Sequence, residues 1–504
     1  MGLAEYGRLD ALGMAELVRR GEVTARELID EAIARIERVD PQLNAVVERI
    51  FDRARERAAG GLPEGTFSGV PFATKNVLAP IAGVHIDGGS RFFHGHIAAR
   101  DSTLVSRYRQ AGLVFLATTN APELGLLPVT EPELHGPTRN PFDLSRTPGG
   151  SSGGSAALVA SGALPMAHGN DGGGSLRIPA SCCNLFGLKP SRGRVPVGPD
   201  YQEIWHGFVC DHVVSRTVRD SAATLDAVRE PEPGALYWTP PPDRPYLEET
   251  RWPPRRLRIA LSVTPHLPAK VDPRCAEATR AAGRLCESLG HVVEEAAPVF
   301  HPRELAKAFF TAVVSELAAD IRRGEVLMKK KARPADFEVS TWLVAMLAGE
   351  VSAADLASSV AMLRDVSRHV GRFLETYDMM LTPTLALPPP RIGELLPKGL
   401  ERRMQALAAA TSSSLLLKLG GGIEGAVDRV FEFVPFTPLA NFAGLPAMSV
   451  PLGVADGLPI GVQFIGRFAD EATLFHLAAQ LEQAAPWTGR RPTVSADGPA
   501  PDLR

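Results

Sequence analysis

The sequence predicts an α/β fold: one large α/β/α domain with a mixed, largely parallel central sheet flanked by helices. Two observations support this fold class. Short apolar runs of strand length alternate along the chain with segments of helical period, an order typical of α/β proteins. The chain also has 504 residues, of which 45% are hydrophobic, and large α/β folds often reach this size as a single unit.

The first 65 residues are predicted to form helices that pack on the core. Thr24 to Glu27 have the spacing of a capping box, and apolar residues then recur with the helical period. Pro41 is expected to end this helix, because proline lacks the backbone donor that a continuing helix needs.

Residues 66–230 are expected to form the core that holds the functional site. Short apolar runs are separated here by Gly, Pro, Asn and Ser. Residues 113–116 predict a buried strand, and residues 156–160 predict a helix that ends at Gly162. Eight prolines between residues 231 and 254 then indicate a connecting segment, which we assign to 231–256.

The second half of the chain divides into two predicted segments, 257–435 and 436–504. The first is expected to shape the substrate pocket, and the second to complete the same α/β domain. The predicted elements are strands at 257–261, 447–450 and 460–465, and helices at 275–289 and over most of 303–375.

The composition argues against several classes of protein. Lys and Arg number 54 against 57 Asp and Glu, so the chain lacks the positive charge typical of a nucleic-acid binder. No run approaches the roughly 18–20 apolar residues that would span a bilayer, and residues 1–7 do not resemble a signal peptide. Five cysteines fit a reducing compartment. We expect a cytoplasmic protein with no nucleic-acid or membrane partner.

The histidine and cysteine positions predict no metal site. His85, His94 and His96 lie close in the sequence, but no carboxylate or further histidine follows at the spacing of metal ligands. Cys182 and Cys183 are adjacent and do not form a Cys-x-x-Cys motif.

Two stretches rich in glycine and serine, 147–157 and 169–180, carry the candidate chemistry. A flexible linker would seldom lie between patterned strands and helices, and a phosphate-binding P-loop needs a lysine that neither stretch has. A serine-hydrolase elbow stays open, because residues 150–154 match Gly-x-Ser-x-Gly around Ser152. The proline-containing approach to that serine, however, does not resemble the strand that an elbow requires.

A fourth interpretation uses both stretches and predicts an acyl-transfer site. Because they lack Cβ atoms, Gly172, Gly173 and Gly174 let successive backbone N–H groups converge on a developing oxyanion. Ser175 follows them as the candidate nucleophile, and a hydroxyl nucleophile needs a base. Lys75 is the only lysine in the first 188 residues and has apolar neighbours. Burial lowers the pKa of an amine, which makes this lysine a candidate base.

These motifs resemble those of the amidase signature family of hydrolases. Ser151 and Ser175 lie 24 residues apart with Lys75 well upstream, which is the arrangement of that signature. The resemblance covers nearly the whole chain and extends through residues 441–451 and 457–466. It implies a single large α/β/α domain that hydrolyses a carbon–nitrogen acyl bond, with neither a metal ion nor an organic cofactor.

The resemblance also implies a Ser–cis-Ser–Lys triad. Ser175 corresponds to the nucleophile and Lys75 to the base. Ser151, joined to Gly150 by a cis peptide bond, corresponds to the serine that passes protons between them. Ser152 corresponds to a residue that supports the lysine.

Other residues match the supporting positions of the family. Asp171 and Arg177 correspond to a pair that fixes the oxyanion loop. The sequence departs from the family at Asn170, where Ser or Thr is usual, and at Asn76, where Asp is common. Both departures leave the triad in place but make the pKa of Lys75 harder to predict.

The predicted pocket residues Trp205, Phe208 and 412–422 carry few charges, so an uncharged, fairly hydrophobic amide is the expected substrate. Residues 171–194 are similar to the subgroup of 6-aminohexanoate cyclic dimer hydrolases, near aryl acylamidases and urethane-cleaving amidases. Aryl amides, nylon-oligomer-like amides and carbamates are therefore candidates. The alternatives are a glutaminase subunit of a tRNA-dependent amidotransferase and an esterase that uses Ser152 as nucleophile. The sequence leaves open whether the protein is a homodimer.

Overall fold

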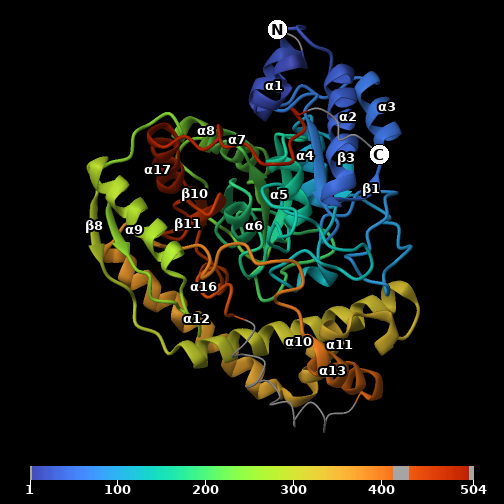
Figure 1. Cartoon of the computed structure of the whole chain (residues 1–504), viewed down its shortest axis with the longest axis vertical. Coiled ribbons are helices and arrows are strands. Elements are labelled where there is room, and N and C mark those ends of the chain that lie inside the picture. The colour runs from blue at the N-terminus through green and yellow to red at the C-terminus, as the bar shows by residue number, and fades with distance from the viewer. Residues whose placement is uncertain (1–2, 413–430, 499–504) are drawn as a thin grey trace.

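The computed structural model describes residues 3–412 and 431–498 (Figure 1). Its strands are β1 Val46–Arg49, β2 Pro71–Lys75, β3 Val114–Thr119, β4 Met166–Asp171, β5 Phe186–Lys189, β6 Cys210–Ser215, β7 Arg258–Leu261, β8 Val292–Glu295, β9 Met379–Pro383, β10 Ala447–Ala455 and β11 Leu458–Gly466. Its helices are α1 Ala11–Arg19, α2 Ala25–Leu43, α3 Phe51–Ala59, α4 Thr103–Gln110, α5 Gly153–Ala160, α6 Arg177–Cys182, α7 Val218–Val228, α8 Tyr246–Glu249, α9 Pro273–Ser288, α10 Pro302–Met328, α11 Val339–Leu347, α12 Ala353–Thr376, α13 Gly399–Thr411, α16 Pro438–Phe442 and α17 Glu471–Ala484.

The strands form two sheets within the described residues. The smaller has the order β1-β3-β2, and the larger has the order β4-β6-β5-β10-β11-β9-β7-β8. The predicted class, a mixed sheet flanked by helices, is confirmed. The prediction of largely parallel pairing is wrong: five of the seven neighbouring pairs in the larger sheet are antiparallel, and only β9-β7 and β7-β8 are parallel. Strands such as β4 and β11 are buried along their whole length in either arrangement, so their apolar runs do not reveal direction.

Most predicted elements are found close to their expected limits. Thr24 caps α2 with the predicted capping box, and the strands expected at 447–450 and 460–465 are the hairpin of β10 and β11. The predicted end at Pro41 is wrong, because α2 continues to Leu43. Leu43 is fully buried, and the Asp40 carboxylate accepts hydrogen bonds from the backbone just beyond the helix. The burial of Leu43 and the hydrogen bonds to Asp40 stabilise the last turn of α2 despite Pro41.

The two sheets meet where the candidate site residues lie. β2 of the smaller sheet contacts β4 at the edge of the larger one, and α5 packs against both strands. α6 packs on β5, β10 and β11, while α7, α9 and α17 also cover the larger sheet (Figure 1). The carboxyl end of β2, the loop before α5 and the loop after β4 therefore come together at this junction.

The helices α10, α11 and α13 lie together at the end of the molecule opposite the N-terminal helices (Figure 1). The helices α10, α11 and α12 confirm the prediction that residues 303–375 are mostly helical. Among the described residues, no single helix has the length and apolar character needed to cross a membrane. Only the bent pair Val339–Glu350 and Ala353–Thr376, which meet at 104°, reaches that length and composition when taken together.

Candidate active site

Lys75 is the last residue of β2 and has no solvent exposure. Its Nζ donates hydrogen bonds to Ser151 Oγ at 2.6 Å and to Asn170 Oδ1 at 2.5 Å. Burial lowers the pKa of Lys75 to about 7, although the negative charges of Asp211 and Asp171 act in the opposite direction. The amine is therefore able to lose its proton near neutral pH while it contacts a serine hydroxyl.

Ser151 lies in the loop that leads into α5, and the peptide bond from Gly150 to Ser151 is cis, as the resemblance implied. The loop is tightly packed, since a Cβ on Gly150 would lie 2.7 Å from the backbone of Val129. Glycine is thus the residue that fits before Ser151. The Ser151 side chain is almost fully buried, with 1% exposure.

Ser175 ends the glycine loop that follows β4. It is 8% exposed, more than Ser151 or Lys75, and its hydroxyl has no hydrogen-bond partner among the described residues. The Gly174 N–H donates to Asp171 Oδ1 at 2.8 Å, so this predicted oxyanion donor is already occupied. The N–H groups of Gly173 and Ser175 donate to no acceptor in residues 3–412 and 431–498, and they remain available to a ligand.

A buried ion pair fixes the shape of this glycine loop. Arg177 and Asp171 are fully buried and joined by two hydrogen bonds, at 2.8 Å and 3.0 Å. Burial alone would raise the pKa of Asp171, but the charge and hydrogen bonds of Arg177 lower it to about 2. The carboxylate therefore stays ionised and also accepts the backbone N–H groups of Gly174 and Leu176.

Two residues of this network were not singled out from the sequence. Arg177 donates to Asn441 Oδ1 at 2.6 Å and to Gln463 Oε1 at 2.5 Å. Asn441 in turn donates to the carbonyl oxygens of Asp171 and Phe208. Both residues lie in the segments 441–451 and 457–466 that carry the family resemblance, and this was the only sign in the sequence that they belong to the site. Their partner, Arg177, is more than 250 positions away in the chain.

The structure corrects the expected support for the lysine. Ser152 Oγ donates to the carbonyl oxygen of Asn170 at 3.2 Å and makes no hydrogen bond with Lys75 among the described residues. Ser152 precedes α5 and packs against the backbone of β4, because a Cβ added to Gly169 would lie only 2.7 Å from its Oγ. The Asn170 side chain, rather than that of Ser152, contacts the amine directly.

Aromatic side chains surround the glycine loop. A Cβ on Gly172 would lie 3.4 Å from the Trp205 ring, and one on Gly173 would lie 3.7 Å from Phe309 of α10. The rings of Phe208 and Phe309 have centroids 5.9 Å apart. The predicted pocket residues Trp205 and Phe208 therefore lie beside the loop. Of the predicted pocket stretch 412–422, all but Ser412 lies outside the described residues.

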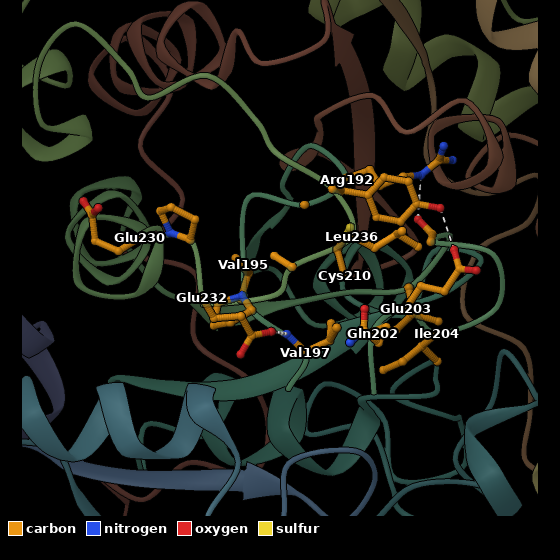
Figure 2. A pocket seen from close by; sticks show the side chains of 17 residues that line it. Arg192, Val195, Val197, Gln202, Glu203, Ile204, Cys210, Glu230, Glu232 and Leu236 are labelled. Carbon is orange, nitrogen blue, oxygen red and sulfur yellow. Dashed lines mark hydrogen bonds between the residues drawn. The ribbon is translucent and has the colours of Figure 1, made fainter. Parts of the chain in front are cut away.

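Figure 2 shows a pocket that none of the loop residues 172–175 lines. Its lining includes Arg192, Glu203, Glu232 and Cys210, and Cys210 is opposite Asp171 in the β4-β6 pairing. No residue of the predicted triad lines this pocket. Within residues 3–412 and 431–498, no group of three or more His, Cys, Asp or Glu side chains is placed to hold a metal ion.

Both the sequence and the structure are similar to those of known proteins. The family model described as Amidase matches residues 27–475. The chain is 38% identical over 501 residues, 96% of each chain, to a 6-aminohexanoate-cyclic-dimer hydrolase of Paenarthrobacter ureafaciens. A solved 6-aminohexanoate cyclic dimer hydrolase complexed with substrate matches with a TM-score of 0.88 and 35% identity, over 97% of this chain and 99% of that one. A bacterial aryl acylamidase structure matches with a TM-score of 0.82 and 27% identity, over 95% and 97%.

Proposed function

The chain belongs to the amidase family, and we propose that it hydrolyses uncharged, fairly hydrophobic amides through Ser175, Ser151 and Lys75. The general reaction, hydrolysis of an amide bond, follows from the family. The observation that supports the proposed triad is the 2.6 Å contact between Lys75 Nζ and Ser151 Oγ in a fully buried environment. The assignment of Ser175 rests on its place at the end of the glycine loop and on its being, at 8%, the most exposed of the three side chains.

In the proposed mechanism, the neutral amine of Lys75 accepts the proton of Ser151 as Ser151 accepts the proton of Ser175. The Ser175 oxygen attacks the amide carbonyl, and the oxyanion forms hydrogen bonds with the N–H groups of Gly173 and Ser175. The relay then runs in reverse and protonates the leaving amine, which departs as the C–N bond breaks. Water attacks the acyl-enzyme with the same relay as base, and the acid product leaves.

The proposed substrate class follows from the surroundings of the glycine loop. Trp205 and Phe309 lie next to Gly172 and Gly173, and such rings favour an apolar group on either side of the reacting carbonyl. The relatives reported above are named a 6-aminohexanoate-cyclic-dimer hydrolase and an aryl acylamidase. We therefore include cyclic nylon-type dimers and aryl amides among the proposed substrates. A carbamate presents a similar carbonyl, and its cleavage would release carbon dioxide, an amine and an alcohol.

The two alternatives have less support. A glutaminase needs polar groups that bind the α-amino and carboxylate groups of glutamine, whereas aromatic rings flank this loop. An esterase that uses Ser152 as nucleophile needs an accessible hydroxyl. Ser152 is fully buried, and its hydroxyl donates to the Asn170 carbonyl oxygen.

The proposal is tested by labelling with a fluorophosphonate probe and by a substrate screen. We expect the adduct on Ser175, loss of turnover in Ser175→Ala, and retained labelling in the matched variant Ser152→Ala. The screen compares anilides, cyclic and linear nylon oligomers, small carbamates and glutamine. An adduct on Ser152 would instead favour the esterase, and turnover of glutamine alone would favour the glutaminase.

A further inference from the structure

His168, Asn170 and Asp211 are three polar residues on the face of the larger sheet that contacts Lys75. His168 and Asn170 lie two positions apart in β4 and so point to the same side of the strand. Asp211 of β6 is directly opposite Asn170 in the antiparallel pairing, which places it on that side as well. His168 is fully buried and Asp211 is 3% exposed. Asn170 binds the amine of Lys75, so the other two residues need a separate explanation.

The hydrogen bonds of His168 define its proton position. The backbone N–H of Lys75 donates to His168 Nδ1 at 3.3 Å, and a backbone N–H can act only as a donor. Nδ1 is therefore unprotonated, and the ring proton is on Nε2. His168 Nε2 lies 3.1 Å from Asp211 Oδ1 and donates to this carboxylate. The chain of contacts runs from Asp211 through a neutral imidazole to the backbone of Lys75.

We propose that His168 is a positioning residue for the base, held in one tautomer by Asp211. This inference rests on the proposed role of Lys75. β4 then holds the lysine at two points: His168 fixes the backbone at the end of β2, and Asn170 fixes the amine. Together these contacts align Nζ with Ser151 Oγ. Loss of the backbone contact would let the end of β2 shift away from the serine loop, and small misplacements of reacting groups lower rates strongly.

Asp211 also acts on the charge of the lysine. The charges that act on Lys75 come from Asp211 of β6 and from Asp171 of β4, which is bound to Arg177 of α6. Two further titratable groups lie close to this chain of contacts: the Tyr108 ring of α4 has its centroid 6.1 Å from that of His168, and His212 follows Asp211 in β6 but points to the opposite face. Burial lowers the pKa of Lys75, and the charges of Asp211 and Asp171 raise it. Burial keeps Tyr108 neutral by raising its pKa well above the usual value, and it lowers the pKa of His212 to about 3. Asp211 and the Arg177-bound Asp171 are thus the negative charges that favour the protonated amine.

The experiment separates the two contacts of His168 with paired variants of the full-length protein. In His168→Gln the amide reaches toward Asp211 but offers no acceptor to the Lys75 N–H. His168→Asn places a carbonyl near the Nδ1 position and loses Asp211. His212→Asn is the matched control, since His212 is buried, points to the opposite face of β6 and binds Ser221. Thermal unfolding of each variant establishes that it is folded before kcat and KM are measured.

Turnover is compared at pH 9, where the amine of Lys75 is neutral. A change in kcat at this pH then reflects the position of the amine and not its protonation. We expect His168→Gln to lower kcat about tenfold with KM unchanged, as a buried donor left without its acceptor would do. His168→Asn recovers most of that loss, and His212→Asn matches the wild type. Equal kcat in His168→Gln and the wild type, or equal losses in His168→Gln and His212→Asn, would overturn the positioning role.

A second measurement does not depend on turnover. ¹³C-lysine labelling followed by NMR titrates Lys75 directly, with Lys75→Met used to assign its signal among nine lysines. Asp211→Asn keeps an acceptor for His168 but removes the charge, and we expect the Lys75 midpoint to fall by about one pH unit. An unchanged midpoint would overturn the role of Asp211. A shifted midpoint in a protein that hydrolyses no amide would support the effect of Asp211 on Lys75 and overturn the proposed function.

Discussion

Two buried lysines end strands of the two different sheets, in contrasting surroundings. Lys75 ends β2 and Lys189 ends β5, and neither has any solvent exposure. Burial lowers the pKa of both amines. Lys75 donates to the hydroxyl of Ser151, whereas Lys189 donates to the carbonyl oxygen of Pro190 at 2.6 Å and lies 3.8 Å from the thiol sulfur of Cys210.

The comparison shows that burial alone does not make a lysine a base. A neutral amine can act as a base only on a partner that has a proton to give, and a carbonyl has none. The Cys210 thiol has a proton, but burial raises its pKa and therefore holds that proton in place. The hydroxyl of Ser151 and the glycine loop beyond it distinguish Lys75. The predictions below test this distinction.

The largest expected effect is on turnover by the two lysine variants. Lys75→Met should lower kcat/KM by about 10² to 10⁴, the usual contribution of a general base. Lys189→Met should lower it less than about tenfold, because Lys189 contacts no group that we place in the reaction. Steady-state rates on an anilide measure both. Similar losses in the two variants would remove the distinction.

The next effect concerns the buried ion pairs beside each lysine. Arg177 binds Asp171 in the glycine loop, and Arg194 binds Glu471, whose carboxylate also accepts the Ser191 N–H close to Lys189. Replacing either arginine by methionine leaves a buried carboxylate without its partner, which costs about 3–5 kcal/mol of the free energy of unfolding.

Urea unfolding should show comparable destabilisation for the two arginine variants, while kcat of the folded protein separates them. Arg177→Met should lose activity, because the glycine loop loses the group that orders the Asp171 carboxylate. Arg194→Met should keep it. Activity lost equally in both folded variants would mean that the two regions are not functionally distinct.

The sequence was sufficient to predict the fold class and to indicate Lys75, Ser151 and Asn170, which the structure brings into contact. Gly150 and Gly174 have a physical reason to be glycine, because a Cβ would lie 2.7 Å from the Val129 backbone at the first and closer still to Thr437 Oγ1 at the second. Such a pattern of glycines is visible without a structure. Lys75 stood out because lysine is rare in the first part of the chain. Capping residues such as Thr24 act within a few positions of the chain, and their effect was predicted correctly.

The remaining features depend on contacts between distant segments. Asn441 and Gln463 bind Arg177 only because β11 and the segment before β10 fold against α6. His168 resembles any buried histidine until β2 is placed beside β4. Strand direction in the larger sheet was predicted wrongly for a related reason, since fully buried strands have the same apolar pattern in parallel and antiparallel pairs.

A third prediction concerns pH. With the pKa of Lys75 lowered to about 7, the amine is protonated and inactive as a base below that pH. We therefore expect kcat/KM to fall about tenfold per pH unit below pH 7 and to level off above it. Lys189→Met should keep the same midpoint. A profile that is flat from pH 5 to pH 9 would contradict the assignment of Lys75 as base. A midpoint that moves in Lys189→Met would mean that the titrating amine is Lys189 and not Lys75.

The smallest expected effect is at Asn170. Among the described residues, Lys189 contacts the Pro190 carbonyl oxygen and the Cys210 thiol and has no equivalent of this side-chain amide. Asn170 Oδ1 accepts from the amine at 2.5 Å, and its Nδ2 donates to the Val77 carbonyl oxygen at 3.1 Å. Asn170→Ala removes one acceptor and should lower kcat/KM at pH 9 by about 2- to 10-fold.

The direction of the accompanying pH shift gives Asn170→Ala its value as a test. An acceptor stabilises the protonated amine more than the neutral one, so its loss should move the kcat/KM midpoint to lower pH. Asn170→Ser, with the residue usual in the family, should fall between the wild type and Asn170→Ala. If Asn170→Ala changes neither rate nor midpoint, Ser151 alone positions the amine, and the contrast with Lys189 reduces to a single hydroxyl.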